Sequence, residues 1–317
     1  MTPFSILGDI SAEHFLADYW QKKPLLVRNA IGNFEPPIAG DELAGLALEP
    51  EVESRLIVGS DWHMTEGPLT EAQFAGLPEK QWTLLVQAVD LWIPEVSALL
   101  DRFRFLPPWR IDDIMVSYAA DGGGVGPHFD YYDVFLLQGS GRRKWQIGQT
   151  CDHHSALIDH PNLKILADFN VTDEWILDPG DMLYIPPRMA HWGTAIGACT
   201  TFSIGFRAPS ATEMLDDLAT ELLSREPEPT FLADPPLTPQ MANDNIDPAY
   251  IKQIRALLLE TLNDETLLTE WFAQYMTQPK YPMLVDETGE QRTASVRHGA
   301  TETGSQSTKH FENGLPI

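Results

Sequence analysis

Three side chains that could bind a metal stand in two separate stretches of the chain. His128 and Asp130 are one residue apart in the stretch Gly-Pro-His-Phe-Asp, so on a strand both would point to the same face. His191 follows the stretch Asp-Pro-Gly-Asp-Met-Leu-Tyr-Ile-Pro-Pro, which is typical of a turn, a short strand and a forced bend. Two imidazoles and one carboxylate on one side of an ion form a facial triad, which leaves coordination positions open and suits non-haem Fe(II).

The combination of the two stretches makes this prediction specific. A His-x-Asp sequence alone occurs by chance in many chains. A β-barrel, however, can place the strand before His191 beside the one that bears His128 and Asp130. We therefore predict that these three residues are the metal ligands and form the catalytic centre.

Other histidines are better explained without a metal. Cys151-Asp-His-His154, with Asp159 and His160, has adjacent rather than alternating ligands in a segment rich in turn residues. This pattern favours a polar surface loop. His14 and His63 have no partners nearby in the sequence, and we assign them structural roles.

A basic cluster could bind an anionic co-substrate. Oxygenases that use Fe(II) in such a site usually need an electron-donating co-substrate as well as dioxygen. If that substrate is 2-oxoglutarate, a cation must hold its distal carboxylate, and Arg142, Arg143 and Lys144 are the candidates. Side chains alternate along a strand, so Arg143 shares a face with Trp145 and Ile147, which should point into the barrel. We predict that Arg143 is the buried cation, which can bind a carboxylate with two hydrogen bonds. The alternative is that all three charges form an exposed strand edge.

The surrounding sequence predicts a mainly β fold with helical additions. From Ile111 to Arg207, short β-like runs are separated by Gly, Pro and Asp, which is typical of a closed or two-sheet barrel of the jelly-roll kind. We place this barrel, with preceding helices and strands, at residues 1–208. Helix signals follow at 209–278. Residues 279–317 are polar and predicted to form a C-terminal tail.

The helical region carries aliphatic residues along one side and could form a homodimer. An alternative is that this surface packs against the chain's own barrel.

Composition restricts the location and the partners. The 317 residues carry a formal net charge of −25, which disfavours direct nucleic-acid binding and leaves a basic polypeptide substrate plausible. No apolar run is long enough for a membrane span, and the N-terminus lacks signal-peptide features. The two cysteines form no disulfide framework and suit a reducing compartment, so we expect a cytoplasmic protein.

Four stretches resemble a known family, the JmjC-type, cupin-fold 2-oxoglutarate oxygenases. They are Phe15–Arg28, Gly122–Phe135, Gly139–Trp145 and Asp178–Gly193. The chain is most similar to the bacterial ribosomal oxygenases that hydroxylate an arginine of the sixteenth protein of the ribosomal large subunit. The resemblance covers roughly residues 5–280, and it implies a double-stranded β-helix followed by a helical dimerisation region and a winged-helix module. The last module is where this chain departs, because its C-terminal stretch is short and poor in apolar residues, a remnant at most.

The resemblance also implies a reaction and its cofactors. It assigns iron to His128, Asp130 and His191, and the distal carboxylate of 2-oxoglutarate to Arg143. With Fe(II) and dioxygen, the enzyme would convert an arginine side chain of a basic ribosomal protein to hydroxyarginine and release succinate and CO₂. The bound arginine would need acidic or aromatic neighbours. Candidates by proximity are Asp121, Tyr131, Tyr132, Asp133 and Trp192.

Two other functions stay open. The same chemistry could act on another protein residue, as in histidyl or asparaginyl hydroxylases or demethylases, because these share the triad and the anion-binding cation. The chain could instead be a metal-binding cupin without catalytic activity. Turnover of 2-oxoglutarate to succinate would count against the second alternative.

Overall fold

The chain divides into two compact units. The computed structural model describes residues 6–225, 230–241, 244–281, 298–303 and 307–317. The first unit contains residues 1–208 and 280–296, and the second contains residues 209–279 and 297–317. Lys280 and Tyr281 thus belong to the first unit, which the sequence does not reveal. Among the described residues, the structure contains no helix long and apolar enough to span a membrane.

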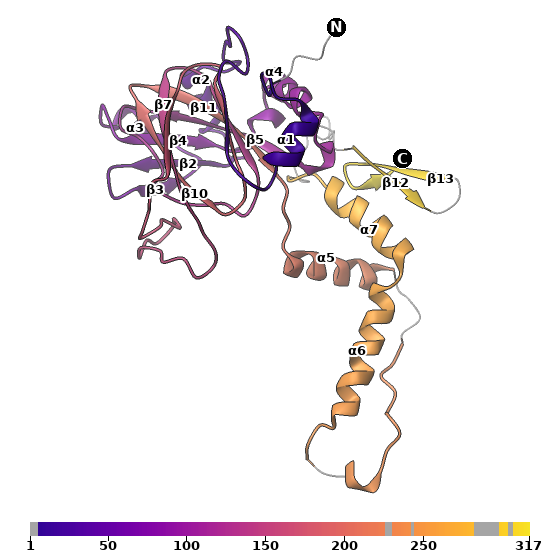
Figure 1. The fold of residues 1–317 in the computed structure, drawn as a ribbon. Helices are drawn as coiled ribbons and strands as arrows, with labels where there is room; N and C mark the ends of the chain where they lie inside the picture. Colours follow the sequence, from indigo (N-terminus) through magenta and orange to yellow (C-terminus); the bar gives the residue numbers. More distant parts are fainter. Residues whose placement is uncertain (1–5, 226–229, 242–243, 282–297, 304–306) are drawn as a thin grey trace. The chain divides into compact units, whose positions relative to one another are not determined.

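The first unit is built on two antiparallel sheets (Figure 1). Its large sheet has the strand order β1-β9-β6-β11-β5-β4-β2-β3, and the small sheet has the order β10-β7-β8. The large sheet consists of β1 (Leu25–Val27), β2 (Ser54–Val58), β3 (His63–Glu66), β4 (Trp82–Val86), β5 (Ile111–Ala119), β6 (Val134–Gln138), β9 (Met182–Ile185) and β11 (Cys199–Phe206). The small sheet consists of β7 (Arg142–Thr150), β8 (Asp173–Leu177) and β10 (Met189–Ile196).

The inner faces of the two sheets share an apolar cluster. Leu136 and Leu183 of the large sheet pack with Trp145, Ile147 and Leu177 of the small sheet. Trp145 and Ile147 alternate with more exposed neighbours along β7, as a half-buried strand requires. The central strand β7 therefore turns every second side chain toward the space between the sheets.

A second, larger core covers the other face of the large sheet. It contains Phe15 from α1 (Ala12–Asp18) and Leu43 from α2 (Gly40–Leu46), together with Phe103, Phe135 and Phe206. The aromatic rings of Phe103 and Phe135 lie 5.0 Å apart between centroids, a distance at which tilted rings attract. The remaining short helices of this unit are α3 (Glu71–Ala75), α4 (Pro94–Ser97), η1 (Val89–Leu91), η2 (Ala98–Phe103) and η3 (Pro108–Arg110).

The second unit begins with helices that have well-formed caps. Ser210 accepts a hydrogen bond from the Glu213 backbone N–H at 3.2 Å, and the Glu213 carboxylate accepts one from the Ser210 N–H at 2.7 Å. This is the capping box expected from the sequence. The helices are α5 (Ala211–Ser224), η4 (Pro239–Met241), α6 (Pro248–Leu262) and α7 (Glu265–Thr277).

The end of the chain differs from the expected tail. Strands β12 (His298–Thr303), β13 (Ser307–Glu312) and β14 (Leu315–Pro316) form an antiparallel sheet within the second unit. Phe311 is 3% exposed, and β12 and β13 contact α7. One buried aromatic residue among polar ones gives little periodic signal, so the sequence did not predict these strands. The part of the expected tail at 282–297 lies outside the described residues.

Candidate active site

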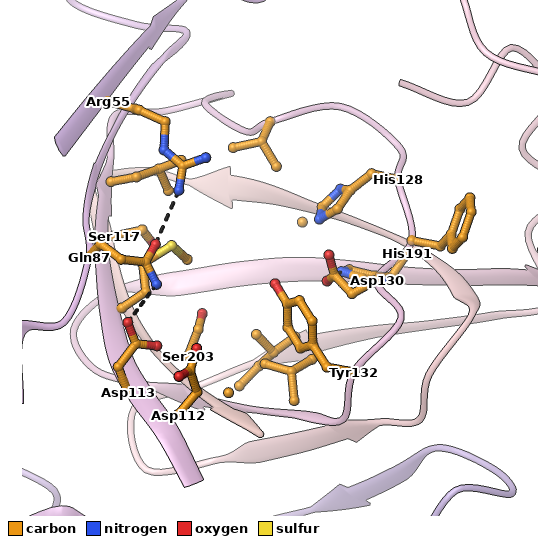
Figure 2. A pocket seen from close by; sticks show the side chains of 18 of the residues that line it. Arg55, Gln87, Asp112, Asp113, Ser117, His128, Asp130, Tyr132, His191 and Ser203 are labelled. Atoms are coloured by element: carbon orange, nitrogen blue, oxygen red, sulfur yellow. Dashed lines mark hydrogen bonds and ion pairs between the residues drawn. The ribbon is translucent and has the colours of Figure 1, made fainter. Parts of the chain in front are cut away.

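A cavity of about 460 Å³ lies inside the first unit. Figure 2 shows His128, Asp130 and His191 gathered on one side, with Asp112 and Asp113 across the cavity. Residues from both sheets line it, and the chemically active ones form three groups. They are the metal-capable His128, Asp130 and His191; the buried cation Arg143; and a charged cluster that includes Glu53, Asp112, Asp113 and Lys280.

His128 and Asp130 lie in an irregular extended segment, not in the regular strand that the sequence predicts. His128 forms an isolated antiparallel bridge with His191 of β10. The His128 N–H donates to the His191 carbonyl at 3.1 Å, and the His191 N–H donates to the His128 carbonyl at 2.8 Å. Gly126, with φ of +79°, and Pro127 precede this bridge and prevent a longer ladder. The bridge nevertheless brings both histidines together.

Glycines let the segment approach the barrel closely. A Cβ at Gly123 would lie 2.2 Å from the Trp82 carbonyl oxygen, and one at Gly124 would lie 2.5 Å from the Gly193 carbonyl oxygen. Any side chain at these two positions would push the segment away from β4 and β10. The glycine run therefore fixes the position of His128.

The three ligand atoms converge on one point. They all lie within 4.8 Å of one another, and His191 Nε2 is 3.6 Å from Asp130 Oδ2. Each imidazole has its Nδ1 3.0 Å from a backbone carbonyl oxygen, of Gly126 for His128 and of Met189 for His191. Because a carbonyl only accepts, both Nδ1 atoms must carry the proton, which leaves each Nε2 lone pair available to a metal.

Protonation also favours metal binding. Burial lowers the pKa of His191 to about 4, with a further lowering by His128 and an opposing effect of Asp130. His191 is therefore neutral near pH 7, as a metal ligand must be. The residues fit a divalent metal in charge, donor type and tautomer. In the part of the chain that the structure describes, this is the one group of its kind, so the rival loop at Cys151–His160 does not gather ligands.

Arg143 is a buried cation whose charge is not compensated. It is 5% exposed, as the strand alternation predicts, while Lys144 forms an ion pair with Glu174 at 3.5 Å. Arg143 Nη1 donates to Ser117 Oγ at 3.1 Å and to Thr201 Oγ1 at 3.3 Å. Its Nε is buried without an acceptor. Among the described residues, no carboxylate forms an ion pair with it, so this end of the cavity is suited to an anion.

A second buried donor lies beside Arg143. The guanidinium carbon of Arg143 is 5.6 Å from the centroid of the Trp145 ring. Trp145 Nε1 is also buried and has no acceptor within the described structure. The sequence assigns Trp145 only an apolar role, since alternation reveals its direction but not the lack of a partner. Each such donor costs about 1–3 kcal/mol if left unmet.

The opposite end of the cavity is acidic and was missed by the sequence analysis. Asp113 accepts hydrogen bonds from Gln87 Nε2 at 2.8 Å and from Lys280 Nζ at 2.9 Å. Burial raises the pKa of Asp113, although Lys280 opposes the rise. Asp113, Met115 and Ser117 all line the cavity from one face of β5. The alternation of Asp113, Met115 and Ser117 along the strand is the sequence signal that could have placed Asp113 in the cavity.

The five expected arginine contacts are distributed differently. Tyr132 lines the cavity, whereas Tyr131 is 54% exposed. Asp121 pairs with Lys80 in solvent at 2.9 Å. Asp133 is buried and accepts a hydrogen bond from the Tyr184 hydroxyl at 2.6 Å. Trp192 packs edge-on against Trp62 and Phe169 and is not among the lining residues.

Comparison with known proteins gives close matches. The family model for the JmjC domain matches residues 98–214. Over 271 residues the chain is 40% identical to the ribosomal protein uL16 3-hydroxylase of Escherichia coli, covering 85% of this chain and 72% of that protein. Over 306 residues it is 39% identical to a probable ribosomal oxygenase of Haemophilus influenzae, covering 90% and 73%.

A solved structure extends the similarity to the fold. The ribosomal oxygenase YcfD from Escherichia coli, in complex with cobalt and 2-oxoglutarate, superimposes with a TM-score of 0.81 at 34% identity. The match covers 98% of this chain and 86% of that one. The predicted double-stranded β-helix of the JmjC and cupin type, followed by a helical part, is thereby confirmed.

Proposed function

This chain belongs to the JmjC-domain ribosomal oxygenases, and from that premise we propose that it is a 2-oxoglutarate-dependent hydroxylase of ribosomal protein uL16. The names of its relatives give the substrate class. The observation that carries the proposal is the uncompensated cation Arg143 in the same cavity as a complete set of metal ligands. A cupin that binds metal alone would not need that cation, and one that also binds small anions without catalysis is separated by the turnover test below.

The metal that we propose is Fe(II), held by His128, Asp130 and His191. Bound there, it would supply the dioxygen chemistry that hydroxylates an unactivated carbon. The chain's own residues orient the participants. The Nδ1–H groups of both histidines hold the rings in place through backbone carbonyls, and the apolar residues between the sheets exclude water.

The co-substrate site is proposed at Arg143. A distal carboxylate would accept from the unmet Nε–H of Arg143 and balance a charge that burial makes costly. It could also accept from Trp145 Nε1, which is buried and without an acceptor. Both donors would gain their missing partners from one ligand.

An arginine side chain fits the acidic end better than other targets do. A guanidinium carries five N–H donors and a charge that requires carboxylates, and Asp112 and Asp113 line this end. Ser203 also lines the cavity beside Asp112 and Asp113, whereas the Tyr132 hydroxyl points toward Asp130 (Figure 2). A histidyl or asparaginyl target, which is neutral at pH 7, would not need paired carboxylates. We therefore favour arginine hydroxylation over those alternatives.

The decisive experiment measures oxygen transfer to uL16. The protein is loaded anaerobically with Fe(II), mixed with 2-oxoglutarate and recombinant uL16, and then exposed to air. Mass spectrometry should find one added oxygen on an arginine of uL16. The variants His128→Ala and Arg143→Met should abolish or strongly reduce it, whereas Lys144→Met, on the other face of β7, should not.

Each other outcome has a definite meaning. One added oxygen on a histidine or asparagine would keep the oxygenase and overturn the arginine assignment. Succinate release without any change in uL16 would overturn the substrate. Neither product, with iron bound, would favour the non-catalytic cupin.

We also propose that the second unit forms a homodimer. One helix, α6, leaves large aliphatic side chains exposed, including Ile251 at 51% and Leu258 at 61%. Such a row is costly in water and is typical of a helix that packs against a second copy. Light scattering should give twice the chain mass, and Ile251→Glu with Leu258→Glu should give the monomer. A monomeric wild type at micromolar concentration would refute the proposal.

A further inference from the structure

Lys280 occupies the acidic end of the cavity. Its Nζ is 2.9 Å from Asp113 Oδ2 and 3.1 Å from Asp112 Oδ2, so one ammonium bridges two carboxylates. Its side chain is 29% exposed, whereas that of Asp113 is 6% exposed. Lys280 thus reaches from the cavity rim to a buried acid. Its ammonium has the charge and the donors of the group that an arginine substrate would bring.

The carboxylates at this end already have cationic partners. Among the described residues, the ion pairs here join three carboxylates to three cations. Arg55 Nη2 lies 3.8 Å from Glu53 Oε1, Arg207 Nε lies 3.4 Å from Asp112 Oδ1, and Lys280 pairs with both Asp112 and Asp113. A guanidinium that entered this end would therefore compete with these cations for the same carboxylates.

Lys280 is the cation best placed to leave. Arg55 belongs to β2 and also donates to Gln87 Oε1 at 3.1 Å. The Arg207 side chain is 17% exposed, against 29% for Lys280. Lys280 has a long flexible stem and follows a helix that ends at Thr277, and its side chain is already 29% exposed, so its ammonium lies close to water.

We propose that Lys280 is a placeholder that holds the substrate's cation subsite in the free enzyme and is displaced by the substrate guanidinium. This inference rests on the proposed function, since it concerns the same cavity. It makes Lys280 a specificity-determining residue. A substrate ammonium would only replace the Lys280 ammonium by an equivalent group and gain no contacts. A guanidinium adds donors and a planar geometry that can span Asp113, Asp112 and a neighbouring hydroxyl.

The protonation states agree with such an exchange. Burial alone would lower the pKa of Lys280, but Asp113 and Asp112 outweigh it and raise the pKa above the usual value. The ammonium is therefore charged while it is bound.

The first test is the variant Lys280→Met, which removes the charge and keeps the stem. With no competitor to displace, KM for uL16 should fall roughly tenfold, while KM for 2-oxoglutarate stays the same. Lys80→Met is the matched control, because Lys80 also pairs with an aspartate, Asp121 at 2.9 Å, but outside the cavity. An unchanged or raised KM for uL16 in Lys280→Met would overturn the inference.

A second test follows Lys280 directly. Acetylation of lysines by an amine-reactive reagent, read by mass spectrometry, is compared for the anaerobic iron and 2-oxoglutarate complex with and without uL16. Release of the ammonium should raise the labelling of Lys280 when uL16 binds, and not that of Lys80. Equal or lower labelling would mean that Lys280 stays in place, and would refute the placeholder.

The two proposals fail in different ways. If wild-type protein does not hydroxylate uL16, the proposed function fails and the placeholder fails with it. If uL16 is hydroxylated but neither KM nor labelling responds as described, only the role of Lys280 is wrong.

Discussion

The two ends of the cavity handle charge in opposite ways. At one end a single cation, Arg143, is 5% exposed and lacks an ionic partner among the described residues. At the other end Asp112 and Asp113 are already paired with Arg207 and Lys280. Residues of both ends line the same cavity, so the difference in charge pairing does not come from solvent access alone.

This difference indicates how each ligand should bind. An anion at Arg143 gains a full charge pair in a buried site, which favours affinity. A cation at the acidic end must replace one that is already there, so it gains only the difference between two sets of contacts. Exchange of this kind favours discrimination between cations over tight binding.

The largest effect should come from the residues that both ends depend on. His128→Ala removes one of the three proposed metal ligands, and turnover should fall by more than the roughly 10- to 100-fold that loss of a supporting residue costs. Succinate release and bound iron are measured together. Full turnover with iron retained would show that the metal lies elsewhere. The two ends of the cavity would then no longer flank the reaction site.

The next largest effect should separate the anion end from the acidic end. Arg143→Met removes a buried charge-assisted contact worth about 1.5–3 kcal/mol, so KM for 2-oxoglutarate should rise roughly 10- to 150-fold. KM for uL16 should change little. Lys144→Met is the control, since Lys144 pairs with Glu174 on the outer face. Equal increases in both KM values would mean that the two ends are not independent.

Part of this comparison could be read from the sequence. The burial of Arg143 follows from the alternation of side chains along a strand, because Trp145 and Ile147 fix the buried face. The grouping of His128, Asp130 and His191 follows from the residue types and the turn–strand–bend pattern taken together. In both cases a pattern within a few residues determines where the side chain points, and closure of the barrel then brings these side chains into one cavity.

The acidic end could not be read in the same way. Asp113 sits on a strand face that alternation predicts, but its importance comes from Lys280, which is 167 residues away in the sequence. No local pattern predicts that a residue after a helical region returns to the barrel. The sequence also does not predict that His128 and Asp130 lie in an irregular segment. That segment approaches the barrel where Gly123 and Gly124 leave room for carbonyl groups that are distant in the sequence.

A smaller effect is expected at Asp113 itself. Asp113→Asn keeps the shape and removes the charge, so KM for uL16 should rise about tenfold, a loss near the lower end for a contact with a charged group. The loss is limited because the free enzyme also loses its ion pair with Lys280. Steady-state kinetics with varied uL16 measures it. A larger rise in KM for 2-oxoglutarate than for uL16 would reverse the assignment of the two ends.

The smallest effect should appear on acidification. Burial raises the pKa of Asp113 above that of an ordinary aspartate, with Lys280 opposing. A raised pKa means that Asp113 takes up its proton at a higher pH, and the protonated acid cannot pair with a guanidinium. KM for uL16 should therefore rise a few-fold as the pH is lowered, and the rise should begin above the range in which an ordinary aspartate, with a pKa of about 3.9, takes up its proton.

Arg143 stays charged throughout that range, so KM for 2-oxoglutarate should stay level while KM for uL16 rises. Asp113→Asn should abolish the rise in KM for uL16, because no proton can then be taken up at this position. If the rise persists in Asp113→Asn, another acid at this end controls substrate binding, and Asp112, which also pairs with Lys280, becomes the residue to replace. The pH profile thus resolves which of two adjacent carboxylates makes the acidic end differ from the end at Arg143.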